Sequence, residues 1–297
     1  MARLKNFYLG ALNITIHPHN PEKYIRLFQD LLMLKQKIKI RGDEVARIGS
    51  CWEINKNNPK DGLYGDIYKY VELEPNDDWF NVQTVEAATE EELKKISIPE
   101  NLKPHFNRFA YVFFPDKHRL IFLTNNEKGK TFNVNTVRRF FSNLFESPEI
   151  LEKYGEVNVS TEQIREQLDS ILKTYKINSL SITLTRPNPD DNEDLDEEVL
   201  RRLLEDQNVN KAEFNYKAVK GLTVKPNEQT QKYARIANSN GNVLALGQDI
   251  EGKPVKISTE EHPLTSSFSF DSDKSELRQL SLTYARQFLD SIIRKNI

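Results

Sequence analysis

Two apolar runs in the middle of the chain, Phe109–Phe114 and Leu120–Leu123, are its densest hydrophobic sequence. Pro115 and Asp116 separate the two runs. Aromatic-rich runs that are bounded by proline and aspartate predict the two strands of a hairpin. Basic and polar residues stand before the first run and between the two runs. The pattern therefore predicts a central hairpin with a short basic loop at each end of its first strand.

The hydrophobic pattern before this hairpin predicts a sheet with a helix packed on it. Apolar residues alternate with polar ones over Phe7–Ile16, which is typical of a strand. Residues 21–34 carry apolar side chains at helical spacing and follow Asn20, a residue suited to cap a helix. Further elements are predicted from the same patterns: strands over Lys37–Ile40, Val45–Ile54 and Asp66–Leu73, and a helix over Asn135–Phe145.

After residue 155 the pattern changes to strands that alternate with helices. The longest predicted strand is Ala212–Val224 and the longest predicted helix is Lys274–Lys295. Such alternation predicts helices that cover a sheet. We therefore expect an α+β fold with mixed α/β layers, in two closely packed domains that are each a sheet covered by helices. The first, residues 1–155, contains the central hairpin, and the second, residues 156–297, ends in the long helix.

The composition is that of a globular protein. Hydrophobic residues make up 38% of the chain, charged residues 29%, and the formal net charge is −2. This charge argues against binding nucleic acid through bulk charge, but it permits a local basic patch. No apolar run approaches about 18 residues and the N-terminal residues lack a signal-peptide pattern, so we expect no membrane span and a cytoplasmic protein. The single cysteine, Cys51, lies in an apolar context and is interpreted as a buried structural thiol.

The densest basic grouping surrounds the central hairpin, where phenylalanines are interleaved with cations. Aromatic side chains beside cations can stack nucleic-acid bases while the cations contact phosphates. The alternative is that Phe106 and Phe109 belong to the core and that the charges only solvate the loops. The candidate nucleic-acid-binding residues are Lys103, His105, Arg108, Lys117, His118 and Arg119.

Two other groups of residues have side chains of the types that can bind metal ions. His17 and His19 end the first predicted strand at i, i+2 spacing, and Asp190, Asp191 and Asp194 lie between a strand and a helix. Imidazole and carboxylate groups can hold a divalent metal, the one cofactor that these residues suggest. The alternatives are loop histidines that bond to the backbone, and aspartates that stabilise the start of the following helix.

Motifs of the common enzyme classes are absent from the sequence. It contains no phosphate-binding P-loop, no G-x-S-x-G elbow and no dinucleotide fingerprint. Glu92 and Lys94 have the spacing of a nuclease motif, but they belong to a charged run that is typical of a solvated helix.

Segments spread over nearly the whole chain resemble, in the same order, a bacterial family of domains of unknown function, number 4747. The residues that carry the resemblance are 10–24, 40–55, 62–73, 96–122, 179–191 and 257–264. The family brings no established catalytic residues. Families of this type often lie among phage-defence genes, so the resemblance implies a defence role.

These observations lead to one main functional hypothesis and two alternatives. The main hypothesis is a cytoplasmic bacterial protein of anti-phage defence that binds nucleic acid, or a phage or host protein, through the basic grouping at residues 103–119. The first alternative is a metal-dependent nuclease or phosphohydrolase that uses the histidine pair or the aspartates. The second is a structural subunit of a larger complex that docks through its C-terminal helix. The sequence leaves open whether the protein is catalytic, and it does not fix the oligomeric state.

Overall fold

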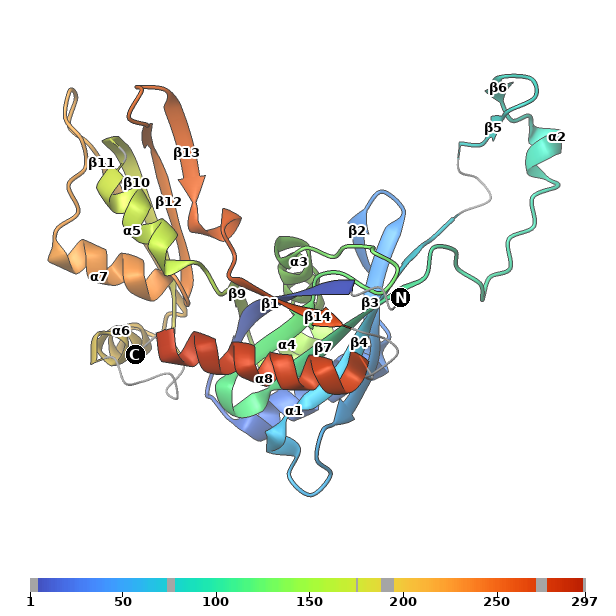
Figure 1. The fold of residues 1–297 in the computed structure, drawn as a ribbon, viewed down its shortest axis with the longest axis horizontal. Coiled ribbons are helices and arrows are strands. Elements are labelled where there is room, and N and C mark those ends of the chain that lie inside the picture. Colours follow the sequence, from blue (N-terminus) through green and yellow to red (C-terminus); the bar gives the residue numbers. More distant parts are fainter. Residues whose placement is uncertain (1–4, 74–77, 175, 188–194, 271–276, 296–297) are drawn as a thin grey trace.

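The computed structural model in Figure 1 describes residues 5–73, 78–174, 176–187, 195–270 and 277–295. Its strands form two main antiparallel sheets with helices packed on them. The predicted mixed α+β class is confirmed. None of the helices described is long and apolar enough to cross a membrane.

The larger sheet is built around β1. Its strands are β1 (Lys5–Ile16), β2 (Ile38–Arg41), β3 (Glu44–Glu53), β4 (Leu63–Val71), β7 (Asn107–Phe114), β8 (Arg119–Leu123), β9 (Val157–Thr161) and β14 (Thr265–Phe270). They lie in the order β14-β1-β8-β7-β4-β3-β2, and β9 pairs with the end of β1 beyond β14. The predicted central hairpin is β7 and β8.

Helices cover both faces of the larger sheet because β1 is apolar on both sides. Leu12, Ile14 and Ile16 face the core formed with α1 (Pro21–Leu34), α3 (Val134–Phe145) and α4 (Pro148–Tyr154). The other face of β1 packs against α8 (Leu277–Lys295). We call the larger sheet with these helices the first lobe.

The second lobe has its own sheet and its own core. Its strands β10 (Lys176–Thr185), β11 (Lys211–Lys217), β12 (Gly241–Gln248) and β13 (Pro254–Ser258) lie in the order β11-β10-β12-β13. The helices of this lobe are α5 (Arg165–Thr174), α6 (Leu195–Asp206) and α7 (Glu228–Ala237). Among the residues described, its apolar core is formed by side chains between 168 and 257.

The predicted domain division at residues 155 and 156 needs a correction. β9, β14 and α8 follow the boundary in sequence but belong to the first lobe. α8 returns because Phe288 and Ile292 complete the core on the second face of the larger sheet. The described apolar side chains of the C-terminal helix, such as Phe288 and Ile292, therefore pack against the larger sheet.

A separate excursion joins β4 to β7. It contains β5 (Phe80–Asn81), β6 (Glu86–Ala87) and α2 (Glu90–Leu93), and Figure 1 shows it extending away from the first lobe. Glu92 closes a capping box with Thr89 at the start of α2. The Glu92–Lys94 run is therefore part of a short capped helix, as its charge pattern indicates.

Candidate functional site

The six basic residues predicted as one group lie at opposite ends of β7. Lys103, His105 and Arg108 are at its start, whereas Lys117, His118 and Arg119 follow its end. β7 has 8 residues and so spans roughly 25 Å. The predicted basic grouping is therefore divided into two halves, which need separate descriptions.

Two of the three basic residues that follow β7 are buried. His118 is 0% exposed and Arg119 is 2% exposed. Arg119 lies directly opposite Asn13 in the β8–β1 pair and donates a hydrogen bond of 2.8 Å to its side-chain oxygen. The Arg119 guanidinium also forms an ion pair with Glu162, with 2.6 Å between Nε and Oε1. The side chains of His118 and Arg119 are therefore inaccessible to phosphates, and Arg119 lies next to the contact that Asn13 makes with Ser239 and Asn240 of the second lobe.

The two predicted metal-binding histidines lie beside the same contact. The His17 Nε2 atom is 3.1 Å from the carbonyl oxygen of Arg186 in the second lobe, and His19 Nδ1 is 3.4 Å from the Tyr24 hydroxyl. Burial and then the positive charge of Arg186 lower the pKa of His17 to about 4. His17 is thus a neutral hydrogen-bonding group at neutral pH, which agrees with the alternative of a loop histidine that bonds to the backbone.

The residues described bring no metal site together. No group of three histidine, cysteine, aspartate or glutamate side chains in this part of the chain could hold a metal ion. The aspartates proposed from the sequence, Asp190, Asp191 and Asp194, lie outside the described residues. Cys51 is half-buried and packs against the core, and burial raises its pKa to about 11, which keeps the thiol protonated.

The half before β7 borders an open part of the larger sheet, on the face that α8 only partly covers. Arg47, Tyr68 and Arg108 lie in one row across β3, β4 and β7. Trp52 lies opposite Tyr64 on the same face and is 49% exposed. We call this surface the aromatic–basic face, and it consists of Arg47, Trp52, Tyr64, Tyr68, Phe106, Arg108, Lys128 and Arg278.

A shallow pocket of about 280 Å³ lies within the aromatic–basic face. At one side the Arg278 guanidinium stacks on Tyr64, 4.7 Å from the ring centroid. Phe106 is 46% exposed, and its ring meets Tyr68 edge-on at 5.1 Å between centroids. Cations thus lie beside partly exposed rings, an arrangement that suits planar, negatively charged ligands.

The backbone beneath Tyr68 explains how its ring is oriented. A Cβ atom at Gly49 would lie 2.4 Å from the Tyr68 ring, so the ring lies directly over that glycine. Gly49 stands at an irregularity in the β3–β4 pairing, between Ile48 and Ser50. A larger residue at position 49 would push Tyr68 off the sheet.

Among the residues described, two acidic side chains line the pocket, Asp66 and Glu127. Asp66 lies beneath the arginines, on β4. Burial raises its pKa, whereas the nearby charges of Arg108 and Arg278 and the Ser50 hydroxyl act in the opposite direction. The Ser50 hydroxyl donates to Asp66 over 3.2 Å. Asp66 and Glu127 therefore offset part of the positive charge that Arg108, Lys128 and Arg278 bring to the pocket.

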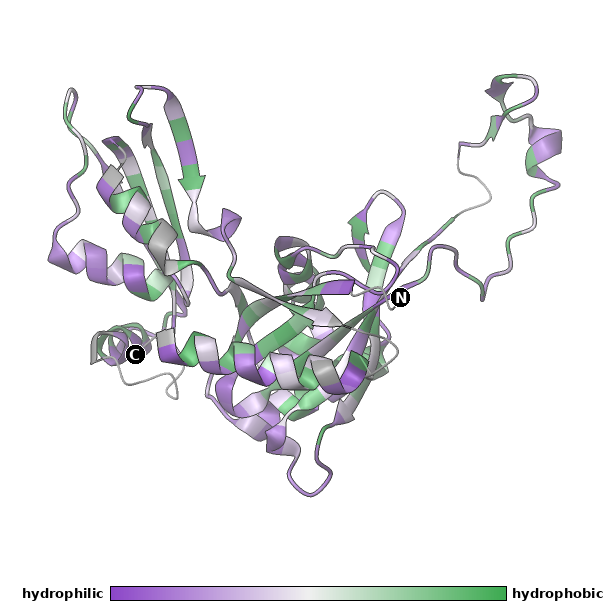
Figure 2. Ribbon diagram, in the orientation of Figure 1, coloured by the Kyte–Doolittle hydropathy of each residue, from purple (hydrophilic) through white to green (hydrophobic). Residues whose placement is uncertain are grey.

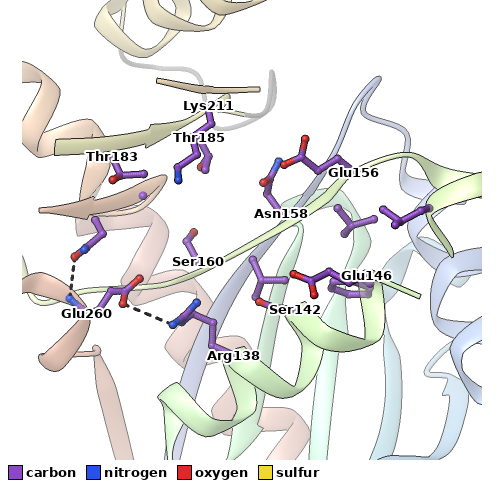
Figure 3. Close-up of a pocket in the computed structure, with 16 residues that line it drawn as sticks. Arg138, Ser142, Glu146, Glu156, Asn158, Ser160, Thr183, Thr185, Lys211 and Glu260 are labelled. Carbon is purple, nitrogen blue, oxygen red and sulfur yellow. Dashed lines mark hydrogen bonds and ion pairs between the residues drawn. The ribbon is translucent and has the colours of Figure 1, made fainter. Parts of the chain in front are cut away.

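A larger cleft, of about 450 Å³, separates the two lobes. Figure 3 shows it between α3 and β9 of the first lobe and the strands of the second lobe. Arg138 and Glu260 face each other across one end, with 3.6 Å between the charged atoms. Sequence reasoning missed this interlobe cleft because its lining is scattered from residue 138 to residue 260.

The comparison with family models gives one match. The model described as Domain of unknown function (DUF4747) matches residues 5–286 of this chain. The match spans both lobes and ends within α8. A search of curated proteins found no match.

Proposed function

The chain belongs to the DUF4747 family, and from its aromatic–basic face we propose that it binds single-stranded nucleic acid. The observation that carries the proposal is the row of Arg47, Tyr68 and Arg108, with Phe106 beside it on an open sheet surface. Bases of a single strand can stack on exposed rings, and phosphates can then reach the neighbouring cations.

The hydropathy of the chain agrees with such a surface. In Figure 2 the strands of the first lobe are largely hydrophobic where α8 crosses them. The aromatic–basic face begins where this cover ends, so Arg47 of β3 and Arg108 of β7 stay in contact with solvent. A local patch of this kind is compatible with a formal net charge of −2.

The first experiment measures binding of short labelled single-stranded DNA and RNA by fluorescence anisotropy at several salt concentrations. We expect the double variant Phe106→Ala with Arg108→Ala to bind more weakly, because a lost stacking contact costs about 1–3 kcal/mol per base. Loss of one phosphate contact should also make the slope of log K against log salt shallower by about 0.7.

The matched control is Lys117→Ala, a cation from the other end of β7. We expect this variant to bind like the wild type. Unchanged affinity of the double variant, binding that does not depend on salt, or an equal loss with Lys117→Ala would contradict the proposal. Equal unfolding temperatures for the three proteins would exclude a general loss of structure.

Two further predictions from the sequence can be tested with the same proteins. Adding magnesium or manganese and measuring product length tests the nuclease alternative, for which the described residues supply no metal cluster. The defence role stays a prediction. Phage plating on cells that carry the wild type or the double variant would test whether defence depends on the aromatic–basic face.

A further inference from the structure

β9 presents a free edge to the interlobe cleft. Within the described residues it pairs with β1 alone. The Glu162 N–H donates a hydrogen bond of 3.3 Å to the Ala11 carbonyl. In an antiparallel pair every second residue bonds to the same neighbour, so Ser160 and Asn158 also turn their backbone groups toward β1. The N–H and C=O groups of Val157 and Val159 therefore point away from β1.

The other neighbour of β1 supports this assignment. The Ile14 N–H donates over 2.9 Å to the His118 carbonyl, on the opposite edge of β1. Val159, which lies opposite Ile14, consequently receives no bond from that amide. A strand with free donors and acceptors at every second residue is a template for another extended chain.

The walls of the cleft differ in polarity on the two sides of this edge. Glu156 to Ser160 all line the cleft, which shows that it runs along β9. Leu151, which is 44% exposed, gives one side an apolar surface, while Thr183 and Thr185 provide hydroxyl groups on the other. Successive side chains of an extended peptide point in opposite directions, so alternate residues would meet these two surfaces.

The charges in the cleft are unequal. Arg138 is paired with Glu260, and Lys211 lies 2.6 Å from a carboxylate oxygen of Glu213. Glu146 and Glu156 lie on the same side of the cleft in Figure 3, and neither forms an ion pair within the part of the chain that the structure describes. Glu156 accepts a hydrogen bond of 2.8 Å from the neutral side-chain amide of Asn210. A basic group in the ligand would therefore be attracted to this side.

We propose that the interlobe cleft binds an extended peptide from a partner protein, which adds to the edge of β9 as a further strand. The peptide has alternating apolar and polar side chains and a lysine or arginine next to Glu146 and Glu156. Backbone hydrogen bonds to Val157 and Val159 hold it, and the cleft walls select its side chains. This site is separate from the aromatic–basic face and does not depend on nucleic-acid binding.

The test uses labelled short peptides in which valine and threonine alternate, with a lysine at one end, and measures their binding by anisotropy. A matched peptide ends in glutamate, and another has N-methyl groups on alternate amides. We expect the lysine peptide to bind at least about tenfold more tightly than either of the others. The glutamate peptide lacks the charge contact, and the N-methylated peptide lacks backbone hydrogen bonds. Amide signals of Val157 and Val159 should shift in the NMR spectrum when it binds.

Two protein variants locate the binding. Ser142→Trp places a large side chain in the cleft from α3 and should abolish binding, whereas the neighbouring Asn143→Trp, on the exposed side of the helix, should not. Glu146→Gln with Glu156→Gln should remove the preference for lysine, and Glu149→Gln, which is exposed outside the cleft, should retain it. Absence of binding, equal binding of the N-methylated peptide, or full binding by folded Ser142→Trp would overturn the proposal.

Discussion

His17 shows how the contact between the lobes controls the protonation of single residues. Its ring lies against the Arg186 carbonyl, which accepts a hydrogen bond only while the facing nitrogen carries its hydrogen. Protonation would place a second positive charge beside Arg186 in a partly buried site. The pKa of His17 therefore falls from its ordinary value of 6.5 to about 4.

This shift predicts a pH dependence of stability. Between pH 6.5 and about 4 the unfolded chain binds a proton at His17 that the folded chain does not bind. Stability should therefore fall as the pH falls through this window, by up to about 3 kcal/mol. Urea unfolding at a series of pH values should show a smaller loss for His17→Gln, which can still donate to the carbonyl.

His105 provides the comparison, because it is exposed and far along the sequence from the interlobe contact. His105→Gln should lose stability with falling pH as the wild type does. Identical pH profiles for His17→Gln and the wild type would show that His17 does not contribute to the acid sensitivity of the fold.

The local sequence identified candidate site residues but could not separate them from core residues. Phe106 and Phe109 stand three positions apart, yet Phe106 is 46% exposed and Phe109 is fully buried. Arg119 has the character of a surface cation until it is paired with Glu162, which follows 43 positions later in the sequence. Arg278, which stacks on Tyr64, comes from a distant helix. These contacts depend on strand order, which the local pattern does not specify.

At the scale of elements, α8 and β14 are what bring the C-terminal residues back to the first lobe. β14 pairs with β1 from Lys5 to Gly10. Phe268 on β14 stacks on Tyr284 of α8, with ring centroids 4.4 Å apart. β14 therefore extends the larger sheet at its edge, and its contact with α8 helps to hold that helix on the second face of the sheet.

Phe288 tests the contribution of this helix to stability. The side chain is 4% exposed and belongs to the core between α8 and the sheet. Phe288→Ala should lower the free energy of unfolding by about 3–5 kcal/mol, because it leaves a cavity in a packed core. Arg286→Ala, on the exposed side of the same helix, should change it by no more than about 0.5 kcal/mol. Equal effects in urea unfolding would show that the helix packs on the sheet only loosely.

The elements most visible in the sequence were those with a strong period. The helix at 21–34 was predicted correctly because Asn20 caps it and its apolar residues recur at helical spacing. β14 was missed because its sequence, TSSFSF, is rich in serine and lacks a clear alternation of apolar and polar residues. Among its residues whose burial is described, Phe268 is the one buried apolar side chain. β11 was predicted too long, and the chain leaves the sheet after Lys217 and turns at Gly221, whose φ is +83°.

At the scale of the whole molecule, the two lobes have separate apolar cores and meet through polar groups. The Gln163 side chain donates to the Gly241 carbonyl over 3.0 Å, and the Asn238 side chain donates to the Gln163 carbonyl over 3.1 Å. Asn13 also donates to Asn240 over 3.1 Å. Directional bonds of this kind fix the lobes at one separation, which is also the width of the interlobe cleft.

We therefore predict that Gln163→Ala with Asn238→Ala uncouples the lobes without unfolding either core. Two buried hydrogen bonds are lost, each worth about 1 kcal/mol, and the carbonyl groups of Gly241 and Gln163 are left without these donors. In calorimetry the transition should broaden or split, with the van't Hoff enthalpy below the calorimetric enthalpy. The control, Ser181→Ala with Asn215→Ala, removes a side-chain hydrogen bond of 2.6 Å within the second lobe and should leave the shape of the transition unchanged.

The same variant separates the two proposed binding sites. The peptide site needs the interlobe cleft, whereas the aromatic–basic face lies within the first lobe. Gln163→Ala with Asn238→Ala should therefore lose peptide binding and keep nucleic-acid binding. A single sharp transition at a lower temperature, or equal loss of both activities, would instead mean that the lobes form one cooperative unit.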